Sequence, residues 1–286
     1  MINYNPKDWI TFIFHFHKSD TFHKLWKLML SVAAFSGLIA YLELSHLKLA
    51  DTTYIKNVNM VHSLLGFVIS LLLVFRTNTS YDRWWEGRKL LGGLVNVSRN
   101  FAMKINALNL SNSDKDFFKY AIPKYAFALK EHLREKQYFG KNSILIEIDA
   151  EKHIPNQVAN NITQKVYQLT ADGKITGEQL IILNKDISQF TDICGGCERI
   201  KNTPIPYTYS AFIKKFIFVY VLTLPIGWVF SLGYFVIALV PFVLYVLASL
   251  ELIAEEIENP FGTDANDLPV DEICNNIEKH VGEILG

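Results

Sequence analysis

A short polar loop near the end of the chain carries the residues best suited to bind a cation. The stretch ENPFGTDANDLP, residues 258–269, contains Asp264 and Asp267 just after a tight turn. Carboxylates and backbone carbonyls are the ligands that Ca²⁺ takes in proteins, so a calcium-binding loop such as an EF-hand is one interpretation to weigh. The loop is not an EF-hand, because Gly262 precedes the acidic residues and no distal glutamate completes it. The alternative is a structural loop, in which an Asn-Pro pair ends a helix and the aspartates cap helices or pair with basic residues.

Two further groups of residues have the spacing of metal ligands. Cys194 and Cys197 are separated by two glycines, and His15 and His17 alternate with aromatic residues. A zinc site would need a second ligand pair near the cysteines, and a thioredoxin-like motif would need a preceding strand. We therefore expect two buried thiols at a helix end, with Cys274 a third free cysteine. The histidines are expected at a membrane interface, in an amphipathic segment.

No catalytic signature is present. The sequence contains no P-loop, no GxSxG and no HExxH motif, and its other histidines are scattered. Its 28 basic and 28 acidic residues balance, so no basic excess points to a nucleic-acid partner. We predict that the protein is not an enzyme, needs no cofactor and binds no nucleic acid.

The distribution of charge predicts a membrane protein. A run of 35 residues, from Phe216 to Leu250, has no charged side chain. As one helix it would measure about 52 Å, whereas the hydrocarbon core of a bilayer is about 30 Å thick. We therefore predict two spans joined by a turn near residues 231–233. Pro225 and Pro241 are expected to kink these helices without ending them.

Two more spans are predicted nearer the N-terminus, at about residues 25–43 and 57–76. Residues 28–42 are uncharged and flanked by lysines whose stems can reach the interface, and residues 57–75 are uncharged up to an abrupt arginine. No cleavage site follows the first apolar stretch, so a signal peptide is not expected. Four spans result.

The positions of lysine and arginine predict the orientation. Positive residues near span ends mark the cytoplasmic side. They gather before the first span, after the second and before the third: Lys7, Lys18, Lys24, Lys27, Arg76, Arg83, Arg88, Lys89, Lys214 and Lys215. We therefore place both termini and the long middle region in the cytoplasm, with the protein in the plasma (inner) membrane.

The chain divides into four segments on this interpretation. Residues 1–75 hold the N-terminal segment and the first two spans, and residues 76–211 form a cytoplasmic helical domain. Residues 212–254 form a hairpin of the third and fourth spans, and residues 255–286 a cytoplasmic C-terminal segment with the acidic loop. The expected fold is all-α, a membrane bundle that continues into a cytoplasmic helical bundle.

Local patterns support the helical domain. Apolar residues recur at helical spacing from Asp114 onwards and again over residues 156–169 and 177–191. Thr176 and Gln179 have the spacing of a capping box. The alternation typical of a strand is limited to a short stretch, residues 144–148.

An apolar stripe lies along the second span. Phe67, Leu71 and Phe75 recur every four residues and so share one face of a helix. The simple interpretation is a lipid-facing or packing surface. The alternative is a hydrophobic constriction, which gates ions by dewetting. A subunit of four spans has no room for its own pore, so this alternative requires an oligomer with the pore on its symmetry axis.

Three sequence blocks resemble the bestrophin family, especially its bacterial members. They are RTNTSYDRWWEGRKLLGGLVNVSRN (76–100), CERIKNTPIPY (197–207) and IENPFGTDANDLP (257–269), and the likeness extends in order over nearly the whole chain. The resemblance implies a homopentameric ion channel with four spans per subunit, a central pore and a large helical cytoplasmic domain.

The resemblance also assigns roles to individual residues. It implies that Phe67, Leu71 and Phe75 form the narrow neck of the pore and that Ile205 lines a second constriction, the cytoplasmic aperture. In calcium-activated members, the position of the acidic loop holds Ca²⁺ with help from the N-terminal segment. Asp264 and Asp267 match its side-chain ligands and Asn259 a carbonyl donor, although Ala265 and Asn266 replace intervening acids. The implied partners are other copies of the chain, membrane lipid and permeant monovalent ions.

Ion selectivity is left open between two alternatives. Family membership favours anions such as chloride, and Arg76, Arg83 and Arg88 would favour anions if they face the pore. Against this, Leu71 interrupts the aromatic neck typical of animal members, and aromatic ring edges can face a passing anion. Asp82 and Glu86 alternate with the arginines and would pair with some of them. The alternative is a channel selective for sodium or potassium.

Two other classes of function are less favoured. A secondary transporter would need inverted repeats or broken helices, and no acidic residue lies within a span. His62 is the only titratable group within a span, and we expect it to pack near the helix start. A membrane-anchored sensor or enzyme lacks a catalytic constellation.

Overall fold

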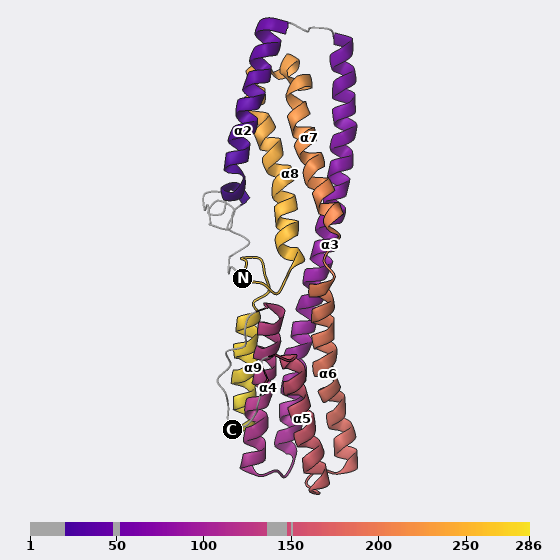
Figure 1. Ribbon diagram of the computed structural model, residues 1–286, viewed down its shortest axis with the longest axis vertical. Coiled ribbons are helices and arrows are strands. Elements are labelled where there is room, and N and C mark those ends of the chain that lie inside the picture. The colour runs from indigo at the N-terminus through magenta and orange to yellow at the C-terminus, as the bar shows by residue number, and fades with distance from the viewer. Residues whose placement is uncertain (1–20, 48–51, 136–147, 150) are drawn as a thin grey trace.

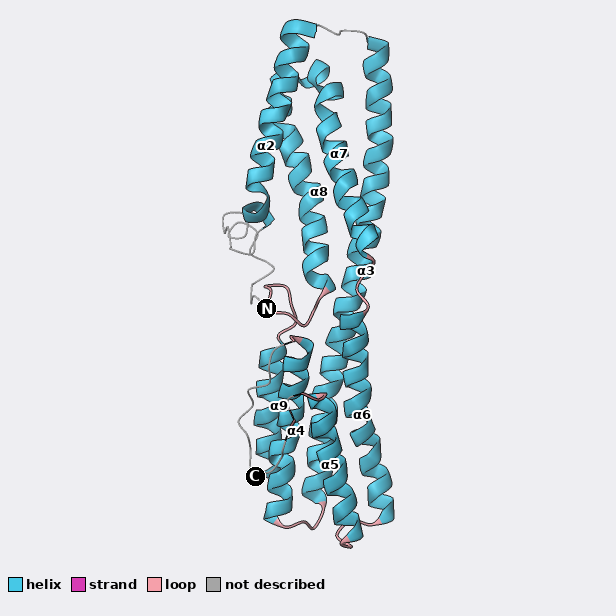
Figure 2. Ribbon diagram, in the orientation of Figure 1, coloured by secondary structure: helices cyan, strands magenta, loops and turns pink. Residues whose placement is uncertain are grey.

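The computed structural model describes residues 21–47, 52–135, 148–149 and 151–286, and these form an elongated all-α structure (Figure 1). Helices and loops alone make up the described residues (Figure 2), which confirms the predicted fold class. In chain order the elements are α2 (Thr21–Tyr41), η1 (Leu42–Leu47), α3 (Thr52–Ala107), α4 (Asn112–Leu133), α5 (Ile154–Ala171), α6 (Gly177–Asn202), α7 (Tyr207–Leu232), η2 (Gly233–Phe235), α8 (Val236–Glu258) and α9 (Val270–Leu285).

The helices form two stacked bundles (Figure 1). The upper bundle contains α2, the first half of α3, α7 and α8, packed around a core that includes Val32, Ile69 and Leu224. Many of its outward side chains are large and apolar, such as Leu30 and Phe242. An apolar surface of this kind suits contact with lipid, because lipid tails are as apolar as these side chains.

Three described segments are long and apolar enough to cross a membrane: Thr21–His46, Asn57–Ala107 and Tyr207–Glu258. The third is folded back on itself as the α7–α8 hairpin. Its turn falls at Gly233, whose φ of 54° lies in the left-handed region that glycine adopts without strain. This is the turn predicted at residues 231–233.

Helix α3 connects the two bundles. It runs for 56 residues without a break, which corresponds to a length of about 84 Å. The sequence-based boundary between the second span and the cytoplasmic domain, at residues 75–76, falls inside this helix. The same rod therefore carries both the apolar stripe and part of the lower bundle.

The lower bundle contains the second half of α3 with α4, α5, α6 and α9. Its core is built around the aromatic side chains of Phe101, Phe118, Tyr125 and Phe190, which contact one another edge to face. The three predicted helices correspond to α4, α5 and α6. The predicted capping box is present at the start of α6, between Thr176 and Gln179.

The two cysteines of the CGGC stretch are buried in the core of the lower bundle, as predicted, but they lie inside α6 and not at its end. Burial raises the pKa of both thiols to about 12, so neither is a reactive thiolate at neutral pH. The histidines at positions 15 and 17 lie outside the described residues, as does all but the last residue of the stretch 144–148.

Candidate ion pathway

The apolar stripe of Phe67, Leu71 and Phe75 is exposed on α3. The exposed fractions of these side chains are 66%, 45% and 57%, whereas Ile69 and Leu73, on the opposite face, are each only 1% exposed. Ile69 and Leu73 pack into the upper bundle, so the stripe points away from the other helices of its own chain. Three large apolar side chains in this position require a partner outside the chain, either lipid or other subunits.

Arg76 lies on the buried face of α3, next to the end of the stripe. Its guanidinium is 1% exposed and donates hydrogen bonds to Glu258 at 2.7 Å, to Glu251 at 3.4 Å and to Ser80 at 3.1 Å. Arg76 comes seven residues after Ile69 and therefore shares its face. Arg76 was expected to favour anions only if it faces the pore, but here it lies on the buried face and its charge is balanced by two carboxylates of α8.

Arg83 is used differently, as a clamp on backbone carbonyls. Its side chain donates to the carbonyl of Glu258 at 3.1 Å and to the carbonyls of Ile200 and Thr203 at the end of α6. The last carbonyls of a helix lack partners inside the helix, and a guanidinium satisfies several at once. Arg83 therefore joins α3 to the ends of α6 and α8.

Some of the charges of this region are paired, as expected, but the pairs join different helices and do not run along α3. Glu86 forms its salt bridge with Arg199 of α6. Arg88 and Asp82 are both exposed. The charge alternation along α3 therefore serves contacts between helices, which spacing along one helix does not reveal.

Ile205 lies in the short connection between α6 and α7 and is half-buried. Its backbone N–H donates to Oε1 of Glu258 at 2.7 Å, and Oε2 of the same carboxylate accepts from Arg76. Glu258 thus links Arg76, which follows the stripe on the buried face of α3, to the candidate aperture residue. Sequence reasoning missed Glu258 and its companion Glu251, although their spacing of seven residues on α8 matches the spacing of Arg76 and Arg83 on α3.

The acidic loop follows α8 directly. Asp267 is buried; its Oδ2 accepts from the backbone N–H of Asp264 at 2.6 Å, and its Oδ1 has no hydrogen-bond partner among the described residues. Burial raises the pKa of Asp267 to about 6. Asp264 and Asn259 are exposed. The indole N–H of Trp84 holds the loop against α3 by donating to a loop carbonyl at 3.0 Å.

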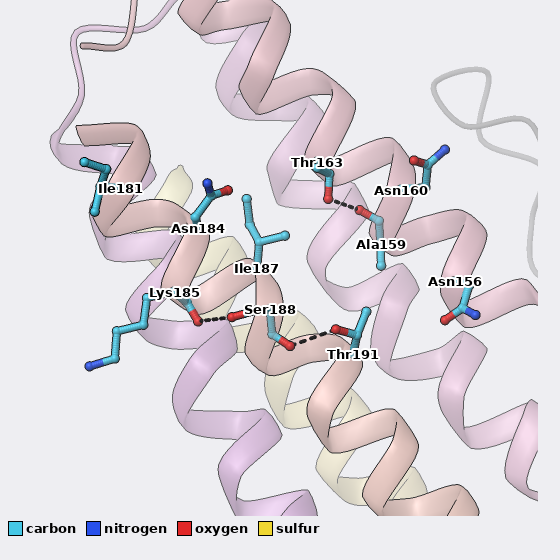
Figure 3. A pocket seen from close by; sticks show the side chains of 10 residues that line it. All are labelled: Asn156, Ala159, Asn160, Thr163, Ile181, Asn184, Lys185, Ile187, Ser188 and Thr191. Carbon is cyan, nitrogen blue, oxygen red and sulfur yellow. Dashed lines mark hydrogen bonds between the residues drawn. The ribbon is translucent and has the colours of Figure 1, made fainter. Parts of the chain in front are cut away.

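A separate groove, with a volume of about 650 Å³, lies between α5 and α6 (Figure 3). Several amides and hydroxyls line it, but most of its exposed surface is apolar, and the hydroxyls of Thr163 and Thr191 donate to carbonyls of their own helices. None of the residues singled out from the sequence lies there. The groove is therefore not the candidate site.

Comparison with known proteins decides the family. The model for "Bacterial/Fungal Bestrophin protein" matches residues 1–283. The chain belongs to the bacterial and fungal bestrophin family. It is 36% identical over 230 residues to a voltage-dependent anion channel-forming protein of Nostoc sp., covering 77% of this chain and 75% of that one. It is 32% identical to YneE of Escherichia coli K12, which bears the same description, over 76% and 73% of the two chains.

The fold comparison agrees. A crystal structure of a point mutant of a bacterial bestrophin homologue from Klebsiella pneumoniae superposes with a TM-score of 0.81 at 26% identity, covering 93% of this chain and 100% of that one. The resemblance found in the three sequence blocks is confirmed. The curated relatives are named as channel-forming proteins, which supports the prediction that this bestrophin is not an enzyme.

The acidic loop by itself offers too few ligands to complete a calcium site. Ca²⁺ takes six to eight oxygen ligands. Asp264 and Asp267 offer two carboxylates, and they belong to no group of three converging His, Cys, Asp or Glu ligands among the described residues. Residues 1–20, expected from the resemblance to contribute further ligands, lie outside the described residues.

Proposed function

We propose that this protein is a homopentameric channel of the plasma membrane that passes monovalent ions, preferentially anions such as chloride. In this proposal the upper bundle spans the bilayer, and the lower bundle and both termini lie in the cytoplasm. The exposure of Phe67, Leu71 and Phe75 on the face of α3 that points away from its own bundle carries the proposal. The channel names of the bacterial relatives support it.

In the proposed pentamer each residue of the apolar stripe forms a ring of five side chains around the axis. A closed cyclic assembly of this kind covers the exposed face of every α3 helix equally. The three rings extend over about 12 Å, because eight residues of a helix separate the first from the last. Such a neck offers no polar group to replace the hydration shell of an ion, so it controls passage by dewetting.

Ile205 forms the second constriction in this proposal, the cytoplasmic aperture. Its position is supported by the hydrogen bond from its backbone to Glu258 and by the clamp of Arg83 on the end of α6. Both contacts restrain the backbone of the connection that carries Ile205, which supports a fixed constriction at this position.

The neck assignment is tested by replacing Phe67, Leu71 and Phe75 together with alanine. Smaller side chains widen the three rings and admit water, so the flux of chloride into reconstituted liposomes should rise. A matched control replaces Leu30, Leu38 and Phe242, which are similarly exposed on α2 and α8, and should leave the flux unchanged. Equal flux through the stripe variant and the unmodified protein would refute the neck.

The choice of ion is tested by the reversal potential in a planar bilayer under a KCl gradient. A value near the chloride equilibrium potential is expected. A value near the potassium equilibrium potential would select the cation alternative, which two observations support: Leu71 interrupts the aromatic neck, and Arg76 is neutralised by Glu251 and Glu258.

We further propose that Asp264, Asp267 and the carbonyl of Asn259 belong to a Ca²⁺ clasp. The support is the buried Oδ1 of Asp267, which lacks a partner among the described residues. Titration of Ca²⁺ should then change the channel current, and Asp264→Ala should weaken the response. A current that ignores Ca²⁺ in the unmodified protein removes this role and leaves a structural loop.

A further inference from the structure

Three helices of the lower bundle bring two histidines and a glutamate together. His132 lies in the last turn of α4, His153 caps the start of α5, and Glu198 lies on α6. The Nε2 atoms of both histidines are 2.7 Å from the same atom, Oε1 of Glu198. The two imidazole rings are 4.4 Å apart between centroids. No part of the proposed ion pathway uses these residues.

The geometry of this cluster is that of a metal site. One ligand atom from each of the three residues lies within 4.8 Å of the other two, and this is the only such group of His, Cys, Asp or Glu among the described residues. The three side chains are 27–32% exposed, so an ion can reach them from solvent. Two imidazoles and one carboxylate, with an open fourth position for water, match a known zinc coordination type.

The charge of the cluster also suits a divalent cation. Glu198 brings one carboxylate to two imidazoles, and this combination of ligands is one that divalent transition metals take in proteins. The neighbouring ammonium of Lys201 is already engaged: it donates to the carbonyl of His132 at 3.0 Å and lies 3.2 Å from Glu135.

We propose that His132, His153 and Glu198 bind Zn²⁺ or a similar divalent transition-metal ion. Imidazole nitrogen is a good ligand for zinc, copper and nickel, whereas Ca²⁺ and Mg²⁺ prefer sites built from oxygen. The site is therefore chemically different from the acidic loop. The proposal of a metal site does not depend on the proposed channel activity, so either one can be refuted without the other.

Metal binding at Nε2 requires each of the two imidazoles to carry its proton on Nδ1 instead of Nε2. Nδ1 of His153 accepts from the backbone N–H of Asn156 at 3.2 Å, so in the metal-free protein the ring carries its proton on Nε2 and donates it to Glu198. When the ion takes Nε2, a neutral ring holds its proton on Nδ1 instead. Nδ1 then no longer accepts from Asn156, so metal binding exchanges the cap of α5 for a metal bond.

The first test measures zinc bound to the purified, tag-free full chain in detergent by equilibrium dialysis and elemental analysis. One Zn²⁺ per chain is expected. Glu198→Gln and the double variant His132→Gln/His153→Gln should each weaken binding at least tenfold. His280→Gln is the matched control, because His280 lies in the same bundle and contacts Arg99 instead of a carboxylate. Unchanged zinc affinity in the Glu198 and double-histidine variants would overturn the proposal.

A second measurement needs no variant and so does not depend on variant folding. Co²⁺ bound to the unmodified protein should give the visible absorption of a four-coordinate ion with nitrogen and oxygen ligands. An intense thiolate band would place the metal at the cysteines and overturn the proposal. Loss of zinc from His15→Gln/His17→Gln, with retention by Glu198→Gln, would overturn it as well, as would no binding at millimolar Zn²⁺.

Discussion

Replacement of Glu258 by glutamine should strongly destabilise the junction between the two bundles. The carboxylate accepts at one oxygen from Arg76 and at the other from the backbone N–H of Ile205, each at 2.7 Å. Glutamine offers one oxygen to these two donors and removes a charge that balances a guanidinium only 1% exposed. Breaking a buried ion pair costs about 3–5 kcal/mol, and since Glu251 remains as a partner we expect the lower end, about 3 kcal/mol.

The consequence is measurable by thermal unfolding in detergent, followed by tryptophan fluorescence. In a chain of this size 1 kcal/mol lowers the Tm by about 2–4 °C, so Glu258→Gln should lower it by about 6–12 °C. Glu255→Gln is the control: it removes the same charge from the same helix, but the Glu255–Lys214 pair is about half exposed. Exposed pairs contribute at most about 1 kcal/mol, so its effect should be small. Equal shifts for the two variants would refute the role of Glu258 as a buried bridge.

Two further predictions concern the lower bundle. Two lysines and a serine hydrogen bond to the buried carboxylate of Asp114 and, against the effect of burial, hold its pKa well below the usual range. The stability that this lowered pKa provides is fully present above about pH 4 and is lost gradually as the pH falls towards the folded-state pKa, so Asp114→Asn should lower the Tm at pH 7, and the difference should begin to shrink below about pH 4. In α6, Gly195→Ala meets open space and should stabilise the helix by about 1 kcal/mol. Gly196→Ala should give no such gain, because its Cβ would lie 2.9 Å from the Leu90 side chain; equal Tm values for the two glycine variants would contradict this packing.

Features that depend on neighbouring residues could be predicted from the sequence. The capping box at Thr176, the turn at Gly233 and the burial of the two α6 cysteines follow from local residue types and from the periodicity of apolar positions. These signals act over a few residues, so one sequence is enough to find them. The overall architecture was predicted from the resemblance of three sequence blocks to the bestrophin family.

Features that depend on tertiary contacts could not be predicted in the same way. Glu258, the partner of Arg76, is 182 residues away in the chain, and the three residues of the proposed zinc site come from three separate elements. One signal was available: Arg76 lies seven residues after Ile69 and nine after Phe67. At 100° per residue it therefore lies on the buried face and opposite the stripe, which argues against a pore-facing position.

The four-residue spacing of the apolar stripe has a mechanical consequence. Residues four apart on a helix differ by about 40° in direction, so the stripe winds about 80° around α3 between Phe67 and Phe75. A helix parallel to the pore axis cannot aim all three side chains at that axis, and the aim of each ring depends on the tilt of the rod. Since α3 is unbroken, a change of its tilt that widens one end of the proposed neck narrows the other end. The same change of tilt moves the lower bundle in the opposite direction. In the proposed pentamer, the three rings and the lower bundle would therefore move together as one lever.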